Sequence, residues 1–106
     1  MNDQHRWRVA VDPGLTVQPT CDHLNDLREV PANREPGCED CLRTGGTWVH
    51  LRACLSCGHV GCCDSSPGQH AHQHAHAAHG HPIARSLEPG EDWAWCYTDE
   101  LFLRPA

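Results

Sequence analysis

The sequence predicts a small α+β domain with an antiparallel β-sheet and one main helix, stabilised by bound metal. The chain has 106 residues, the size of a single domain, and contains only one Phe, one Tyr, one Met and four Trp. So few large apolar side chains cannot build a large core. Eight cysteines are far more than a chain of this length ordinarily contains. Short strand-like stretches around one helix-forming stretch supply the α+β pattern.

The first half of the chain predicts little regular structure before one strand. Residues 1–20 are expected to form an extended or irregular lead-in, and residues 21–104 the domain itself. Residues 24–37 contain two prolines, which favour a loop after a short turn. Residues 47–54 are rich in β-branched and aromatic side chains and follow a Thr-Gly-Gly sequence, so they predict a strand.

The main helix is predicted over residues 68–79. This stretch contains Gly, Gln, Ala and His without a β-branched residue, Pro67 precedes it, and a Gly-His-Pro sequence stops the pattern. Beyond the helix, residues 82–88 and 93–104 flank a Pro-Gly-Glu-Asp sequence. They predict two strands joined by a turn.

Cysteine use and charge exclude several classes of protein. The N-terminal residues lack the apolar segment of a secretory signal, which favours a reducing, cytoplasmic compartment and metal thiolates over disulfides. No apolar run approaches the roughly 20 residues that cross a bilayer, so no membrane association is expected. Eight Arg, no Lys and fourteen Asp plus Glu make the chain acidic. Acidity disfavours the phosphate contacts of nucleic-acid binding.

The spacing of cysteine and histidine predicts structural zinc. Two Cys-x2-Cys pairs can each turn two thiolates toward one ion, and a tetrahedral zinc then needs two further ligands. Cys62 follows the second pair, and His70 and His74 lie one turn apart on the same helix face. One such cysteine pair is a weak signal, but two pairs followed by these residues are a strong one. The pairs are Cys38 with Cys41 and Cys54 with Cys57.

The order of these motifs resembles the zinc finger of ubiquitin-specific proteases, the UBP-type zinc finger. The resemblance runs from about Cys21 to Asp99, and the stretches WVHLRACLSCGHVGC, GHP and WCY fall in the family's order. It implies an α+β, zinc-stabilised fold of the UBP-type over residues 21–104. Little of the chain remains for a protease domain, so we expect a stand-alone finger of the kind found in bacteria.

The resemblance implies three zinc ions, each with four protein ligands. The first set is Cys38, Cys41, Cys62 and His70, the second is Cys54, Cys57, His74 and His81, and the third is Cys21, His23, Cys96 and Asp99. In the third set Asp99 stands where the family has a cysteine, and a carboxylate oxygen can bind zinc at about 2.0–2.2 Å. Because the helix segment is one residue longer than the family's, Cys63 remains an alternative to Cys62, and His79 to His81.

The other three histidines of the helix, His72, His76 and His79, are surplus to these sets and are expected to face solvent. The three sets are closed by protein ligands, whereas a catalytic zinc keeps one position open. The sequence also lacks the His-x-Glu motif of zinc deaminases. We therefore expect no enzymatic activity.

A protein or peptide partner is the expected ligand. Strand alternation puts Cys96 on one face and Trp95 with Tyr97 on the other, and the resemblance implies that this aromatic pair receives the C-terminal Gly-Gly of ubiquitin. The other interpretation is that both aromatics are core packing. The family's arginine that holds the terminal carboxylate is replaced by Asp64, which makes recognition of the ubiquitin tail doubtful unless another arginine, such as Arg85, moves in. The alternative function is a zinc-stabilised scaffold or subunit without a peptide pocket.

Overall fold

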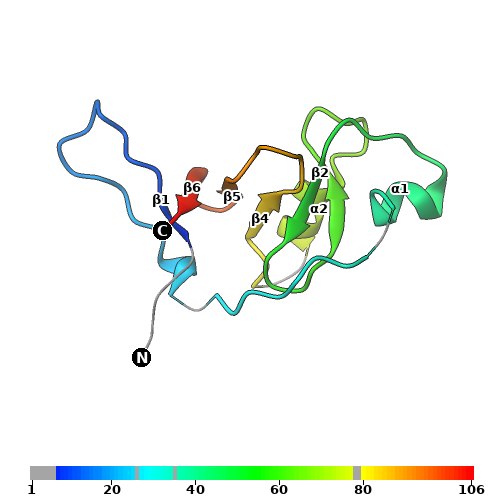
Figure 1. The fold of residues 1–106 in the computed structure, drawn as a ribbon, viewed down its shortest axis with the longest axis horizontal. Helices are drawn as coiled ribbons and strands as arrows, with labels where there is room; N and C mark the ends of the chain where they lie inside the picture. The colour runs from blue at the N-terminus through cyan, green and yellow to red at the C-terminus, as the bar shows by residue number, and fades with distance from the viewer. Residues whose placement is uncertain (1–6, 26, 35, 78–79) are drawn as a thin grey trace.

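The computed structural model describes residues 7–25, 27–34, 36–77 and 80–106, and its main feature is a six-stranded sheet (Figure 1). The strands are β1 (Trp7–Val9), β2 (Leu51–Cys54), β3 (Val60–Cys62), β4 (Ile83–Ser86), β5 (Ala94–Cys96) and β6 (Leu101–Pro105). They lie in the order β1-β6-β5-β4-β2-β3, and every neighbouring pair is antiparallel. The predicted α+β class with an antiparallel sheet is confirmed.

The main helix, α2 (His70–Ala77), lies against β3, β2 and β4. It begins two residues later than predicted, because Gln69 has a φ of 46°, a left-handed conformation that does not continue a right-handed helix. The predicted C-terminal end falls partly on residues 78–79, outside the described residues. None of the described helices has the length and apolar character needed to cross a bilayer.

Two short helical segments were not predicted individually. A 3₁₀ turn, η1 (Asp22–Leu24), lies close to the expected short turn, and α1 (Glu39–Thr44) directly follows Cys38. The Cys38 sulfur caps α1 by accepting a hydrogen bond from the Cys41 backbone N–H. Two acidic residues in the first turn interact favourably with the positive end of the helix dipole. The helix ends at Gly45, whose φ of 81° suits glycine.

The prediction of one strand over residues 93–104 was wrong. The chain reverses after Cys96, and β5 pairs with β6 in antiparallel register, with Trp95 opposite Phe102. The Glu100 backbone N–H donates to the Cys96 carbonyl at 2.8 Å, and Glu100 has a φ of 55°. This tight turn accounts for the break in the strand. The strand predicted over residues 47–54 begins only at Leu51.

The N-terminal lead-in adds an edge strand to the sheet. Trp7 of β1 lies opposite Pro105 of β6, and its side chain is buried. Trp7 joins the larger apolar cluster on one face of the sheet, where Leu55, Ile83 and Leu103 are almost completely buried. The extended conformation of the lead-in was expected, but its pairing with β6 was not.

The opposite face of the sheet carries α2. Ala71 of this helix packs with Ala84 of β4 and with Tyr97, and Trp95 borders the same cluster. The close approach of helix and sheet depends on Gly61 in β3. A Cβ atom at Gly61 would lie 2.7 Å from the Ala71 backbone nitrogen, which is too close for a real contact.

Substituting Gly61 with alanine is therefore expected to push α2 away from β3 and to destabilise the domain by about 1–3 kcal/mol. Gly46→Ala is the control, because its added Cβ would lie 3.4 Å from its nearest atom, the Cys41 sulfur, which is an ordinary contact, and its zinc content is measured to show that this sulfur is undisturbed. Chemical denaturation of both zinc-loaded variants measures the difference. Equal stability of Gly61→Ala and the wild type would contradict the close packing.

Candidate metal centres and binding pocket

The structure gathers the twelve predicted ligands into the three predicted groups. Within each group, one ligand atom from every residue lies within 4.8 Å of the others. The groups, named here clusters 1, 2 and 3, are Cys38, Cys41, Cys62 and His70; Cys54, Cys57, His74 and His81; and Cys21, His23, Cys96 and Asp99. With zinc bonds of about 2.3 Å to sulfur and 2.0–2.1 Å to nitrogen, a tetrahedron separates sulfur from nitrogen by about 3.6 Å and two sulfurs by about 3.8 Å.

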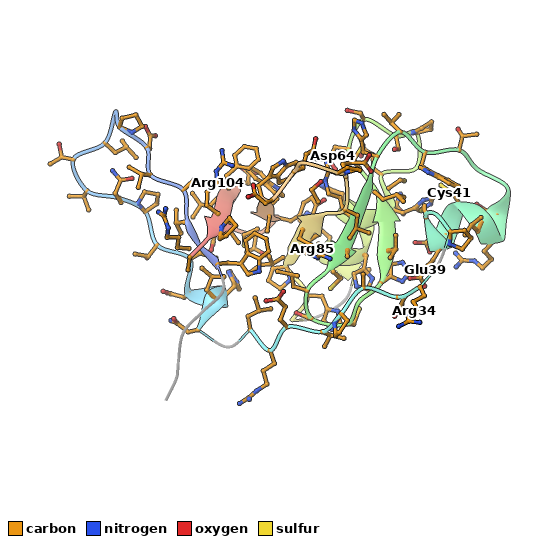
Figure 2. The ribbon with its side chains drawn as sticks, viewed as in Figure 1. Arg34, Glu39, Cys41, Asp64, Arg85 and Arg104 are labelled. Carbon is orange, nitrogen blue, oxygen red and sulfur yellow. The ribbon has the colours of Figure 1, made fainter. Side chains whose placement is uncertain are left out.

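Cluster 1 matches that geometry. The Nδ1 atom of His70 lies 3.4 Å from the sulfurs of Cys38 and Cys41 and 3.3 Å from the sulfur of Cys62. The sulfurs of Cys41 and Cys62 are 4.0 Å apart, and all three cysteines are buried. Figure 2 shows Cys41 on α1, and this helix thus brings the side chain to cluster 1. Trp48 packs against the cluster.

Backbone N–H groups point at the sulfurs of cluster 1. The N–H of Cys41 donates to the sulfur of Cys38, and the N–H of His70 donates to the sulfur of Cys62 at 3.2 Å. These hydrogen bonds fix the positions of both sulfurs. The start of α2 and the Cys-x2-Cys turn thus hold two side chains of cluster 1 in place.

Cluster 2 has the same fit with two imidazoles. Cys54 sulfur lies 3.5 Å from His81 Nδ1, Cys57 sulfur lies 3.4 Å from His74 Nε2, and these two nitrogens are 3.3 Å apart. Burial lowers the pKa of His74, and the neighbouring His59 and His81 lower it further. A lowered pKa favours the neutral imidazole, which is the form that binds metal.

His59 supports cluster 2 and was missed from the sequence. Its ring stacks on the His74 ring, with centroids 4.6 Å apart and an interplanar angle of 9°. Its Nε2 lies 2.7 Å from an Asp40 carboxylate oxygen, and its Nδ1 lies 3.5 Å from a Glu39 oxygen. The carboxylates of α1 therefore fix a ring that in turn fixes a candidate ligand. The signal in the sequence was the acidic pair Glu39 and Asp40, which follows Cys38 and lies far from His59 along the chain.

Cluster 3 is the most exposed of the three. His23 Nδ1 lies 3.0 Å from Asp99 Oδ2, 3.6 Å from the Cys96 sulfur and 3.8 Å from the Cys21 sulfur. The side chains of His23 and Asp99 are 36% and 30% exposed, whereas both cysteines are buried. The Cys21 thiol and the His23 ring lower the pKa of Asp99, which keeps its carboxylate ionised.

The donor chemistry of the clusters suits a divalent cation. Burial raises the pKa of Cys21 and Cys41 to about 12 and that of Cys54 to about 11. The next cause is a hydrogen bond to Asp99 for Cys21 and to Cys38 for Cys41. A bound cation reverses this preference, because its charge stabilises the thiolates. Clusters 1 and 2 offer sulfur and imidazole donors, and cluster 3 adds one carboxylate. Each of the three clusters can therefore hold a zinc ion.

The remaining candidates lie outside the clusters. Cys63, the alternative to Cys62, is buried and its sulfur lies 3.5 Å from the Ser66 hydroxyl oxygen. The other alternative, His79, lies outside the described residues. His72 does not simply face solvent, as was expected. Its ring meets the buried ring of Tyr97 edge-on, at 5.4 Å between centroids.

A pocket of about 250 Å³ lies on the face of the sheet that carries α2. Trp95, Tyr97 and Asp64, the three predicted binding residues, all line it. Trp93 and Phe102 add two aromatic walls, and their rings meet edge to face at 5.4 Å. Cys96 is buried on the other face with the larger apolar cluster, so the predicted alternation along β5 is found.

Two opposite charges line this pocket. The Arg52 guanidinium lies over the Trp93 ring, 4.5 Å from its centroid, and donates to its neighbouring Leu51 carbonyl. The Asp64 side chain is 59% exposed. Burial raises the pKa of Tyr97 to about 12, and the negative charge of Asp64 is the second cause of this rise. The cation of the pocket is thus Arg52.

Arg85 is not at the pocket. It lines a separate hollow with Trp7 and Glu91, and Figure 2 shows it apart from Asp64. Alternation along β4 turns Arg85 to the opposite face of the sheet from Ala84, which packs with Tyr97 and α2. The expectation that Arg85 moves in to compensate for Asp64 therefore has no support in this geometry.

The two pairs of helix histidines are expected to differ in their effect on zinc content. His70→Ala and His74→Ala each remove a group from a cluster, so each variant should lose about one tightly bound zinc. His72→Ala and His76→Ala are the matched controls and should keep three. Native mass spectrometry after exhaustive dialysis measures the content. Equal, small losses in all four variants would contradict the cluster assignment.

Asp99→Ala is expected to weaken zinc binding at cluster 3 by about tenfold or more, because it leaves three protein donors. Asp99→Cys should restore the affinity, since a thiolate can take the same position. Competition with a chromophoric chelator measures both variants, and Glu100→Gln serves as the control for a neighbouring acidic residue. An unchanged affinity in Asp99→Ala would show that the carboxylate is not a ligand.

Comparison with known proteins agrees with the motif order. The family described as "Zn-finger in ubiquitin-hydrolases and other protein" matches residues 38–105. Ubiquitin carboxyl-terminal hydrolase 44 of Danio rerio is 43% identical over 82 residues, which cover 73% of this chain and 11% of that protein. The chain thus spans about a tenth of that relative's length.

A solved structure has the same fold. The solution NMR structure of protein RPA1320 from Rhodopseudomonas palustris is similar with a TM-score of 0.70 and 48% sequence identity, and the match covers 84% of this chain and 85% of that one. The family match, the sequence identity and the three clusters agree on one assignment. This chain belongs to the UBP-type zinc finger family and is a zinc-binding domain.

Proposed function

We propose that this domain is a protein- or peptide-binding module held in shape by three structural zinc ions. The observation that carries the proposal is the aromatic pocket lined by Trp93, Trp95, Tyr97 and Phe102. It is concave, largely apolar and flanked by a few polar groups, as is typical of ligand sites. Clusters 1, 2 and 3 supply the twelve zinc ligands in this proposal.

A binding role fits the clusters better than catalysis does. Each cluster offers four protein donors, which closes a tetrahedral zinc and leaves no position for water or substrate. The matched family is a zinc finger, although the relative from Danio rerio carries the name of a hydrolase. The chain spans only 11% of that relative. Its hydrolase activity is therefore not transferred to this domain, and a cytoplasmic location stays a prediction.

The charges of the pocket favour a neutral or basic segment over a free C-terminus. A terminal carboxylate near the aromatic pair would meet the carboxylate of Asp64. The cation of the pocket, Arg52, is already engaged with Trp93 and with a backbone carbonyl. The exposure of Asp64 limits the size of this repulsion, because solvent screens it. We therefore place the tail of ubiquitin among the poorer ligands.

A scaffold without a pocket is the second candidate. Tyr97 favours it, because its side chain is only 7% exposed and packs with Ala71 and Ala84. Phe102 favours the binding role, because its side chain is 52% exposed and lines the pocket. An exposed apolar side chain of this kind does not stabilise the domain, whereas it can contact a partner. The two functions differ in whether any peptide binds at Trp95.

A matched peptide pair tests the proposal. A peptide ending in Leu-Arg-Gly-Gly with a C-terminal amide should bind the wild type better than the same peptide with a free carboxylate. In Asp64→Arg the order should reverse, with the carboxylate form gaining about tenfold or more. Tryptophan fluorescence follows the titrations.

Asp92→Arg is the control, since it makes the same change at the separate hollow that Arg85 lines. Trp95→Ala should abolish binding of both peptides. Saturable binding of the carboxylate form to the wild type at low micromolar concentration would contradict the charge argument. Absence of any binding, even in Asp64→Arg, would favour the scaffold.

A further inference from the structure

Helix α2 carries two His-x3-His pairs that face different ways. His70 and His74 belong to clusters 1 and 2. His72 and His76 follow each of them by two residues, which on an α-helix is a rotation of about 200°. The second pair therefore points away from both clusters, and none of the three zinc sites uses it.

The second pair is held together beside a buried ring. The rings of His72 and His76 lie with their centroids 4.4 Å apart and their planes at 46°. Both rings also approach Tyr97 edge-on, at 5.4 Å and 6.4 Å between centroids. Because Tyr97 is buried, it fixes one side of the pair. Two histidines four residues apart on one helix face are a spacing that can bind one metal ion through one nitrogen each.

Asp64 lies near one member of the pair, His72. Its Oδ1 is 3.9 Å from Nδ1 of His72, and the two side chains are 59% and 44% exposed. An exposed carboxylate can turn toward a cation that two imidazoles already hold. From this juxtaposition we propose that His72, His76 and Asp64 form a fourth divalent-metal site, on the surface of α2 at the rim of the aromatic pocket.

The ligand set decides which ion the site takes. Two imidazoles and one carboxylate suit zinc, nickel and copper(II), and affinity rises toward copper in that class of site. Three protein ligands leave at least one coordination position open to water. The site contains no thiolate and is partly exposed, so it binds more weakly than clusters 1, 2 and 3 and exchanges its ion readily. It does not depend on the proposed peptide binding.

Zinc itself is the probe. The full chain is loaded with three zinc ions, dialysed and then titrated with further zinc in a calorimeter, while NMR follows the imidazole resonances. One further equivalent should bind, and the shifts should be confined to His72 and His76. His72→Gln, His76→Gln and the double variant should lose this equivalent, and Asp64→Asn should weaken it by about tenfold.

Two controls separate this site from the structural ones. Each variant should still retain three tightly bound zinc ions, which shows that the fold is intact. His50→Gln removes another histidine that lines the pocket and should leave the fourth equivalent unchanged. The proposal is overturned if the wild type takes up no fourth equivalent, or if the double variant takes it up with the same affinity.

Discussion

The gathering of cysteine, histidine and aspartate side chains from distant parts of the chain into three clusters, each able to hold a zinc ion, is the constraint on which the rest of this structure depends. The strands are only three to five residues long, and sheets of such short strands need further support. Cluster 3 joins His23 to Asp99, which are 76 residues apart. Clusters 1 and 2 both draw on α2 and on the strands next to it. A zinc ion in each cluster would supply cross-links that the few large apolar residues cannot replace.

Clusters 1 and 2 are connected to each other through protein side chains. Cys38 caps α1, α1 presents Asp40, and Asp40 contacts the ring that stacks on His74. Glu39 of the same helix also accepts a hydrogen bond from the Val60 backbone N–H at 2.7 Å. The six-residue helix α1 therefore links cluster 1 to cluster 2. Cys38 of cluster 1 caps the start of the helix, and Asp40 of the helix positions His59 against cluster 2.

Much of the site could be predicted because zinc limits ligand type and spacing severely. Spacing alone predicted the two Cys-x2-Cys pairs, whereas the grouping of Cys38 with His70, and of Cys54 with His81, came from the resemblance to a known family. The helix followed from composition. The break between β5 and β6 was missed because the aromatic and apolar residues on either side of it resemble one continuous strand, although Asp99 and Glu100 between them are residue types depleted in strands. The role of His59 depends on a carboxylate 19 residues away, and local sequence carries no signal for it.

The alternation along β5 also has a consequence for how this domain can change over time. Cys96 faces the buried core, while Trp95 and the rest of the pocket wall face outward. Substitutions at Trp95 and Phe102 therefore need not disturb cluster 3, so these two positions can change while that part of the fold is preserved. Both positions suit a combinatorial library in which folding is monitored by metal content, whereas Cys54, on the same face of β2, must be kept because it belongs to cluster 2.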